Sequence, residues 1–141
     1  LRDSDLAELS RLEHLVEVQI GPEHIDPQDP ITEKGMAHLA NCPDLCDLSI
    51  ASDEITDAGV KHLARCHKLT ELNLCSDQLT DASLETISQL DRLEKLGLSG
   101  TGFTDAGIRH LTRLPALRSV SVGPYNTPVP DAAPYVTYRA G

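Results

Sequence analysis

Residues 69–92 read LTELNLCSDQLTDASLETISQLDR, and the same pattern returns before and after them at a fixed interval. A Leu-x-x-(Leu/Val)-x-(Leu/Ile/Val) run opens every 24 residues, at Leu45, Leu69, Leu93 and Leu117. An exact period in this range is typical of a solenoid, in which successive coils of chain stack and share one core. The repeat therefore predicts an elongated fold of stacked coils.

Each repeat predicts one strand with a single buried face. Leu72 and Leu74 alternate with the polar residues Glu71 and Asn73. Successive side chains of a strand point to opposite faces of the sheet. The leucines are therefore predicted to face a core, and the polar side chains to face water.

A helix start follows each strand. Thr80 stands at an N-cap position, where its hydroxyl can accept an N–H of the first turn, and Asp81 lies at the positive end of the helix dipole. Leu79 and Leu84 occupy the two positions of a hydrophobic staple. The staple recurs as the pairs Ile31 with Met36, Ile55 with Val60, and Phe103 with Ile108. Short helices are predicted at 33–40, 57–65, 81–89 and 105–112.

These motifs resemble the leucine-rich repeats. The run Leu-x-x-Leu-x-Leu, followed by Ile-Thr-Asp-Ala-Gly-Val-x-x-Leu, carries the resemblance over residues 6–122. The Thr-Asp-Ala-Gly elements at 56–59 and 104–107 resemble the cysteine-containing subtype of F-box adaptor proteins and of many bacterial repeat proteins. The resemblance implies an α/β fold, a right-handed horseshoe-shaped solenoid with about five parallel strands on its concave side and short helices on its convex side.

The turn after each strand departs from the family pattern. Many leucine-rich repeats place an asparagine two residues beyond the strand, but this chain has Asp53, Asp77 and Thr101 there. An ionised carboxylate can only accept hydrogen bonds. A full ladder of side-chain amides therefore cannot form, and what closes these turns stays open.

The repeats divide residues 1–141 as parts of one leucine-rich-repeat domain. Leu6 and Leu9 stand before Leu15 as helical residues of later repeats stand before their strands. The predicted parts are a helical half-repeat at 1–14, a repeat with a proline-rich insertion at 15–44, regular repeats at 45–68, 69–92 and 93–116, and a strand with an irregular cap at 117–141. Because the chain opens inside a helical pattern and not at Met, we expect a fragment of a longer protein.

The 15–44 repeat is longer than the others, since 30 residues separate Leu15 from Leu45, six more than the regular 24. The added residues lie in GPEHIDPQDP at 21–30, whose three prolines favour an ordered, extended loop. Insertions into solenoids collect on one face, often a binding face. The loop is thus either inert padding or a recognition lip, with the candidate contact residues Glu23, His24, Asp26 and Asp29.

The repeat pattern degrades after Val122. Pro130 replaces the capping Thr and Pro134 stands at the second staple position, so a standard helix cannot begin there. The tyrosines of the chain all lie in this tail, at Tyr125, Tyr135 and Tyr138. The tail is predicted to cover the last coil, with partner contact by the tyrosines as the alternative.

Composition limits the classes of partner. The 141 residues suit one domain, and the sequence has no run of eighteen apolar residues that would span a bilayer. Twelve basic against 22 acidic residues give a formal net charge of -10, and only 3 % of residues are aromatic. Negative charge disfavours nucleic acid and anionic lipid, and few aromatic side chains are present to stack on bases. We therefore expect neither a nucleic-acid nor a membrane partner.

The four cysteines invite a metal interpretation. Cys42, Cys46, Cys66 and Cys75 are separated by 4, 20 and 9 residues, without the close Cys-x-x-Cys pair of zinc sites. Cys42 and Cys66 are 24 apart, and the resembling subtype packs a cysteine of this kind in its core. Structural burial is favoured over a disulfide or a metal site, and no cofactor is expected. Unpaired thiols fit a reducing compartment, so a cytoplasmic location is expected.

Catalysis finds little support in the sequence. His38, His62 and His110 share one repeat position beside core leucines, and partial exposure is favoured over a pH-responsive or metal-binding pair. The sequence contains no nucleophile elbow, phosphate loop or His-Glu-x-x-His helix. We expect that the segment is not an enzyme.

The outward positions of the strands hold the best binding candidates. One column reads Glu17, Asp47, Glu71, Lys95 and Ser119, and the next reads Gln19, Ser49, Asn73, Gly97 and Ser121. Neighbouring strands lie about 4.8 Å apart, so the three acids form a carboxylate row at some cost in stability. This row predicts a basic protein partner. Glu94, Lys95 and Arg118 change the sign of charge toward the C-terminal end, which would orient the partner along the sheet.

Two functions remain open at this point. The first is a protein-protein interaction module that binds a basic partner through the concave face and the loop, with a merely solubilising acidic surface as its alternative. The second is a structural spacer in a larger repeat protein, with end-to-end contacts to further repeats or domains and no ligand of its own.

Overall fold

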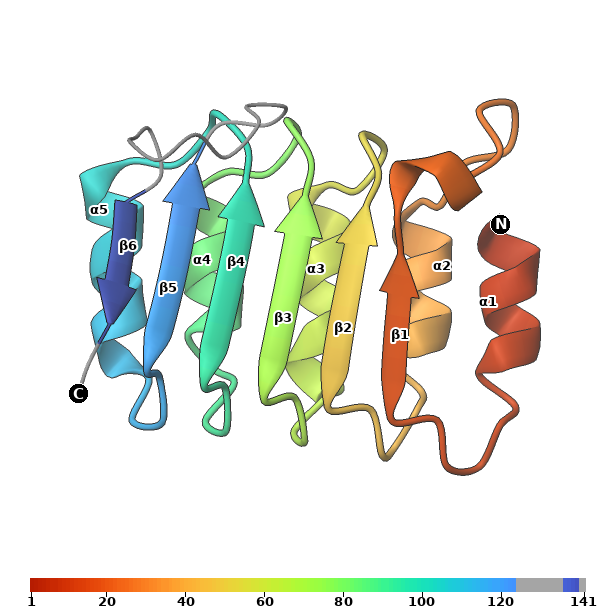
Figure 1. Cartoon of the computed structure of the whole chain (residues 1–141), viewed down its shortest axis with the longest axis horizontal. Coiled ribbons are helices and arrows are strands. Elements are labelled where there is room, and N and C mark those ends of the chain that lie inside the picture. The colour runs from red at the N-terminus through yellow and green to blue at the C-terminus, as the bar shows by residue number, and fades with distance from the viewer. Residues whose placement is uncertain (124–135, 140–141) are drawn as a thin grey trace.

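One six-stranded sheet runs through the molecule in chain order (Figure 1). The structure is a computed structural model that describes residues 1–123 and, as backbone, 136–139. The strands are β1 (Glu17–Ile20), β2 (Asp47–Ala51), β3 (Glu71–Cys75), β4 (Lys95–Ser99), β5 (Ser119–Gly123) and β6 (Val136–Arg139). The first five pair in parallel, and β6 runs antiparallel to β5.

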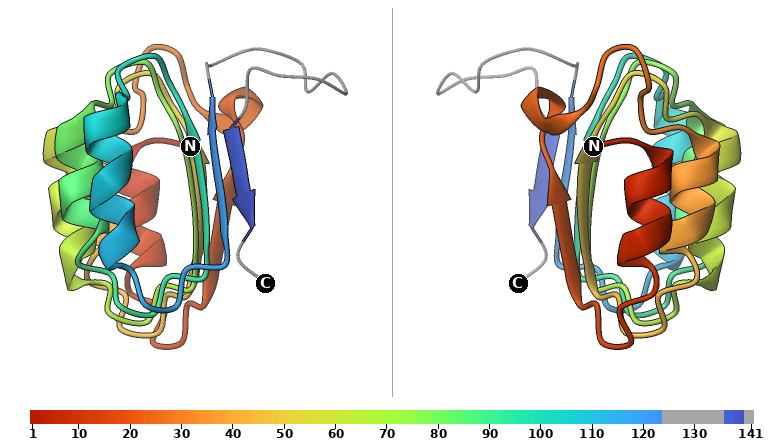
Figure 2. Two further views of the ribbon diagram at one scale, coloured as in Figure 1. Left: turned by 90° about the vertical axis from the view of Figure 1, so that its left-hand side faces the viewer. Right: turned by 90° about the vertical axis from the view of Figure 1, so that its right-hand side faces the viewer.

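The helices lie together on one side of the sheet (Figure 2). They are α1 (Asp3–Leu9), α2 (Glu33–Leu39), α3 (Asp57–His62), α4 (Asp81–Ile87) and α5 (Asp105–Ile108), with short 3-10 helices η1 (Pro22–His24), η2 (Leu63–Arg65) and η3 (Arg109–Arg113). The predicted starts at residues 33, 57, 81 and 105 are confirmed, and η2 and η3 continue α3 and α5. Within the described residues, every helix is too short or too polar to cross a bilayer.

A constant register aligns the regular strands. Leu48 lies opposite Leu72, Leu72 opposite Leu96, and Leu96 opposite Val120, each pair 24 residues apart. The leucines that open these repeats also point into the core, since Leu45 and Leu93 are 0 % exposed. The predicted α/β leucine-rich-repeat solenoid is therefore confirmed. We call the sheet face turned away from the helices the concave face.

The core fills the space between the sheet and the helices. Leu79 and Leu84 of the first staple are fully buried, as are the two earlier pairs, whereas Phe103 and Ile108 of the last are partly buried at the core edge. Each buried aliphatic side chain of this size contributes about 1.5–3 kcal/mol relative to exposure. Stacking is thus what makes the separate strands and helices stable together.

Carboxylates tie the starts of α2, α4 and α5 to the preceding coil. Asp3 accepts hydrogen bonds from the Thr32 backbone N–H at 2.8 Å, the Thr32 hydroxyl at 2.6 Å and the Gly35 N–H at 2.9 Å. Asp81 accepts the same two bonds from Thr104, at 2.8 and 2.5 Å. A Cβ at Gly35 would overlap the Asp3 carboxylate, which explains glycine at this position of the motif.

Serine hydroxyls close the turns after β2 and β3. Ser52 Oγ donates to the Ile31 carbonyl at 3.1 Å, and Ser76 Oγ donates to the Ile55 carbonyl at 2.8 Å. Both serines are buried, so each hydroxyl satisfies a polar group that water cannot reach. The question that the sequence left open is answered by a residue one position before the turn aspartates.

Three terminal or inserted segments differ from simple repeats. The 21–30 loop begins with the 3-10 helix η1 and contains a backbone bridge between Asp26 and Asp29, which is more order than an extended loop requires. Within the predicted irregular cap, β6 instead pairs along the edge of β5. Tyr125 and Tyr135 lie outside the described residues, as does the side chain of Tyr138. At the other end, α1 packs beside α2 (Figure 1).

Candidate functional site

The sheet register brings the predicted concave columns together. Glu17 lies opposite Asp47, Asp47 opposite Glu71, and Glu71 opposite Lys95. The second column is aligned in the same way and comprises Gln19, Ser49, Asn73, Gly97 and Ser121. Glu17, Asp47 and Glu71 thus form a continuous row, which we call the acidic row.

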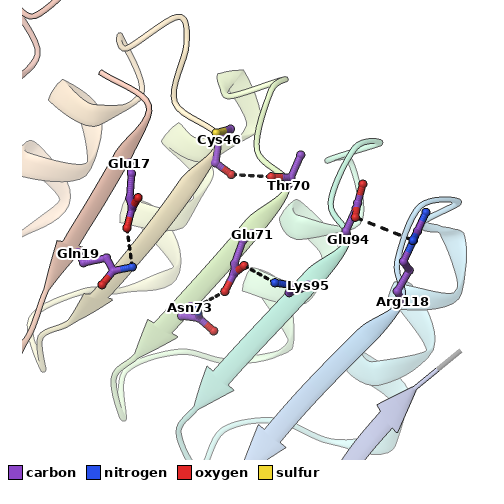
Figure 3. Close-up of polar contacts among 9 residues, drawn as sticks. All are labelled: Glu17, Gln19, Cys46, Thr70, Glu71, Asn73, Glu94, Lys95 and Arg118. Atoms are coloured by element: carbon purple, nitrogen blue, oxygen red, sulfur yellow. Dashed lines mark hydrogen bonds and ion pairs between the residues drawn. The ribbon is translucent and has the colours of Figure 1, made fainter. Parts of the chain in front are cut away.

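Neighbouring polar side chains bind two of the three carboxylates of the acidic row (Figure 3). Lys95 Nζ lies 2.9 Å from Glu71 Oε2, and Asn73 donates to the other oxygen of Glu71 at 3.4 Å. Gln19 donates to Glu17 Oε1 at 2.7 Å. Glu71 therefore has a cationic partner, whereas Glu17 is bonded only by a neutral amide among the described residues.

Asp47 differs from both of its neighbours. Its Oδ1 atom is buried and has no hydrogen-bond partner among the described residues. Burial raises the pKa of the Asp47 carboxyl, and the charges of Glu71 and Glu17 raise it further, against a smaller opposing effect of Lys95. The middle of the acidic row is therefore a partly desolvated carboxylate that lacks a donor.

The remaining predicted face residues lie at the amino ends of the strands. Glu94 and Arg118 approach to 3.9 Å as an exposed ion pair (Figure 3). Thr70 donates its hydroxyl to the Cys46 carbonyl at 3.1 Å and so links β2 to β3 there. Arg118 is therefore turned toward Glu94 and not toward the acidic row.

Charge differs between the two edges of the sheet. The turns at the carboxyl ends of the strands, 21–32, 52–56, 76–80 and 100–104, carry six acidic residues and no Lys or Arg. The turns at the amino ends, 10–16, 40–46, 64–70, 88–94 and 113–118, carry six Lys or Arg and four acids, a difference of +2. The negative potential is therefore concentrated at the carboxyl-end edge, where the 21–30 loop lies.

The predicted contact residues of the loop mostly hold the loop itself. His24 Nδ1 lies 3.1 Å from Glu23, Asp26 Oδ1 accepts the Gln28 N–H at 2.9 Å, and Arg2 lies 3.5 Å from Asp29. These exposed ion pairs are weak individually. Together with the backbone bonds they fix the path of the loop beside the carboxyl-end turns.

A shallow groove follows the concave face beside the acidic row. It measures about 390 Å³ and lies over small side chains, among them Ser49, Ala51 and Gly97. A Cβ at Gly97 would overlap the Asn73 amide oxygen, so glycine keeps the groove open. The groove can receive a chain of extended backbone, because the outward side chains of β2 to β4 that line it are no larger than Asn73.

The cysteines and histidines gather no ligand set. Cys42 and Cys66 are 3 % and 4 % exposed, and burial raises the pKa of the Cys66 thiol to about 11. Cys46 and Cys75 are half-buried, and all four thiols are free. Among the described residues, no group of three His, Cys, Asp or Glu side chains is placed to hold a metal ion. His38, His62 and His110 are half-buried on the helices.

Sequence reasoning missed two acids that belong to this surface. Asp53 and Glu54 follow β2 in the turn that faces the 21–30 loop, and both line a hollow against the loop prolines. The sequence did contain a signal for them. Equivalent turns of successive coils are neighbours in a solenoid, so the turn after β2 was expected to lie beside the 21–30 insertion.

Comparison with family models and with curated proteins gives no match. Among solved structures, an internalin from Listeria monocytogenes matches with a TM-score of 0.65 and 23 % identity, over 86 % of this chain and 32 % of that chain. This chain thus spans about a third of the internalin chain. The similarity supports the leucine-rich-repeat fold.

Proposed function

We propose that this chain is a protein-interaction module that binds a basic protein segment across the acidic row of its concave face. The predicted face and loop residues stay part of this proposal. Asp47 carries it, because a buried carboxylate oxygen without a donor is costly to keep. A lysine or arginine from a partner that pairs with the accessible part of this half-buried carboxyl group would supply the opposite charge and stabilise its ionised form.

The neighbours of Asp47 add to this argument. Glu17 and Glu71 place like charges on both sides of Asp47, and like charges opposite each other weaken a sheet. Lys95 neutralises Glu71 from the far side, which leaves Glu17 and Asp47 as the acceptors for a partner. If the acidic row served only solubility, fully hydrated carboxylates would serve equally well, and a buried oxygen would bring no advantage.

Other properties of the chain are compatible with this function. The formal net charge of -10 disfavours anionic partners. Equivalent core positions of Cys42 and Cys66 support the cysteine-containing repeat subtype, and four free thiols support a reducing, cytoplasmic setting. The proposal assigns the segment no reaction of its own.

The test compares two charge-matched variants by fluorescence anisotropy. The probe is a fluorescein-labelled Gly/Ser peptide with lysines at alternate positions. One variant neutralises the row with Glu17→Gln, Asp47→Asn and Glu71→Gln, and the control neutralises the exposed helix residues with Glu8→Gln, Glu33→Gln and Glu85→Gln. We expect the first to bind about tenfold more weakly, equivalent to about 1.4 kcal/mol, and the control to bind as the unchanged chain does. Equal affinities of the two variants would contradict the proposal.

A second function, end-to-end contact with a further leucine-rich coil, is favoured by one observation. The exposed large apolar side chains of the described residues all lie at the N-terminal end, namely Leu1, Leu12 and Val16, at 43 %, 52 % and 49 %. A prefix copying residues 45–54 would place a strand beside β1. It is expected to raise the melting temperature by about 3 °C, and a scrambled prefix to leave it unchanged; equal melting temperatures would exclude this contact.

A further inference from the structure

A small hollow separates the 21–30 loop from the turn after β2. It measures about 240 Å³, and its loop side is formed by the rings of Pro22, Pro27 and Pro30 together with Ile25. Pockets for drug-sized ligands measure about 300–1,000 Å³, so this hollow suits a single side chain better than a free ligand.

The walls of the hollow are held in place before any partner arrives. The Leu1 carbonyl accepts the Asp26 N–H at 3.2 Å, and within the loop the Ile25 N–H donates to the Pro22 carbonyl at 3.2 Å. On the opposite wall, buried Ser52 is bonded to the Ile31 carbonyl. A preformed site avoids the entropic cost of ordering a loop on binding.

The chemistry of the lining is mixed. Asp53 and Glu54 line the hollow beside the prolines, and both are exposed. Neither takes part in an ion pair with another described residue, whereas Asp29 of the loop pairs with Arg2 and Glu23 contacts His24. A side chain with an apolar stem and a cationic end matches both parts of this lining.

Arginine fits this description better than lysine. Its guanidinium is planar, is more weakly hydrated than an ammonium group, and binds carboxylates through two parallel hydrogen bonds. Proline rings offer flat apolar surface to its stem and plane, and the adjacent carboxylates of Asp53 and Glu54 offer several acceptor oxygens.

The hollow and the concave groove meet at one residue. Ala51 lines both of them. It lies at the end of the strand on which Asp47 begins, four residues earlier, which corresponds to about 13 Å of extended chain. A bound segment that runs along β2 would therefore span both sites.

We infer that the hollow takes an arginine side chain of the same basic segment that crosses the acidic row, so that the partner carries two basic residues four positions apart in extended conformation. This inference rests on the proposed function and adds a sequence requirement to it. Residues four apart in a strand point to the same face, as the two sites demand. The concentration of acids at the carboxyl-end edge favours the same placement of the second cation.

The test uses two fluorescein-labelled Gly/Ser peptides of eleven residues. One carries arginines at positions 4 and 8, and the other at positions 4 and 6, so that composition and net charge are equal. The unchanged chain is expected to bind the first peptide about tenfold more tightly, because only this spacing spans both sites. Two arginines make the peptide insensitive to the direction in which it lies.

Charge-matched protein variants locate the second contact. Asp53→Asn with Glu54→Gln is expected to remove the preference for the wider spacing while retaining weaker binding of both peptides. The control, Asp77→Asn with Glu85→Gln, neutralises the equivalent turn of the next coil and an exposed helix residue, and should retain the preference. Exchange of the arginines for lysines should weaken binding of the wider peptide several-fold.

The outcomes separate this inference from the function on which it rests. Equal affinity of the two peptides for the unchanged chain, or a preference that survives Asp53→Asn with Glu54→Gln, would overturn the arginine site while leaving the acidic row in place. If neutralising the acidic row leaves the affinity of both peptides unchanged, the proposed function fails instead.

Discussion

Asp57 in one coil accepts two hydrogen bonds from Thr80 in the next, from the backbone N–H at 2.9 Å and from the hydroxyl at 2.6 Å. The hydroxyl of buried Ser83 donates to the same carboxylate. One side chain thus orders the start of α4 and joins it to α3. The concave face depends on this stacking, because the acidic row exists only where successive strands stay in register.

Removal of the Asp57 carboxylate should destabilise the fold. Asp57→Ala leaves the Thr80 N–H and the buried Ser83 hydroxyl without their acceptor, and an unsatisfied buried donor costs about 1–3 kcal/mol. We expect the free energy of unfolding, measured by urea titration, to fall by about 2 kcal/mol. Asp57→Asn keeps one acceptor oxygen and should lose less. Equal stability of the alanine variant and the unchanged chain would show that this link is not structural.

Stability should decrease in acid, because the carboxylates of Asp57 and Asp81 join successive coils. Burial disfavours the charge on Asp57, but hydrogen bonds from Ser83 and Thr80 outweigh it and lower the pKa of its carboxyl; bonds from Thr104 lower the pKa of Asp81. A pKa lowered by folding gives stabilisation that is complete above the ordinary value of 3.8 and is lost as the pH falls through the folded-state value.

The melting temperature recorded from pH 7 to pH 2.5 tests this linkage. The unchanged chain should lose stability below about pH 4. The Asp57→Asn, Asp81→Asn double variant should start lower and fall less steeply over the same interval. Parallel curves for the two proteins would mean that other carboxylates cause the acid transition.

One coil lacks the carboxylate link to the next helix start, and a substitution can introduce it. Glu33 stands where Asp3, Asp57 and Asp81 stand in other coils, and the Thr56 side chain makes no capping bond. The Glu33 Cα lies 3.4 Å from a Cβ position at Gly59, so the coils are close enough. Glu33→Asp should stabilise the fold by about 1 kcal/mol in urea. The control Glu85→Asp on α4 should change stability by less than about 0.5 kcal/mol, and a similar change in both variants would refute the explanation.

Thiol reactivity should divide the cysteines into two classes. Burial raises the pKa of Cys42, Cys66 and Cys75, that of Cys66 to about 11, and only the thiolate reacts rapidly. Of these three thiols, Cys75 alone is half-buried and so accessible to the reagent. In the native protein at pH 7.5, iodoacetamide should modify the half-buried Cys46 and Cys75 before the two core thiols, as followed by mass spectrometry. All four should react alike in denaturant. Early modification of Cys66 in the native protein would contradict its placement in the core.

The sequence predicts the stacked fold well, because the repeat length also determines which residues lie opposite each other in neighbouring strands. Leu48 and Leu72 are 24 residues apart and lie opposite each other, so the columns of the concave face follow from subtraction of residue numbers. The closing role of Ser52 was not predictable, since a short polar residue suits any turn. The loop hollow was not predictable for a related reason. An insertion does not follow the 24-residue period, and its path depends on contacts such as that of the Asp26 N–H with the Leu1 carbonyl.

The strand register alone does not predict how the three carboxylates of the acidic row differ in burial and in hydrogen bonding. Its three carboxylates are equivalent in sequence, yet Glu71 is paired with Lys95 and Asp47 has an unpartnered buried oxygen. These differences arise from side-chain conformations within the row. They single out Asp47 as the residue whose environment a bound cation would change most.

The pKa of the Asp47 carboxyl, measured by carbon-13 NMR with and without the lysine peptide, tests the proposed binding most directly. In the free chain the pKa should lie above the ordinary value of 3.8, because burial and the neighbouring acids raise it. Saturating peptide should lower it, since a cation next to the Asp47 carboxylate favours its charged form. A pKa that stays the same when the peptide is bound would contradict the assignment of the acidic row as the binding site.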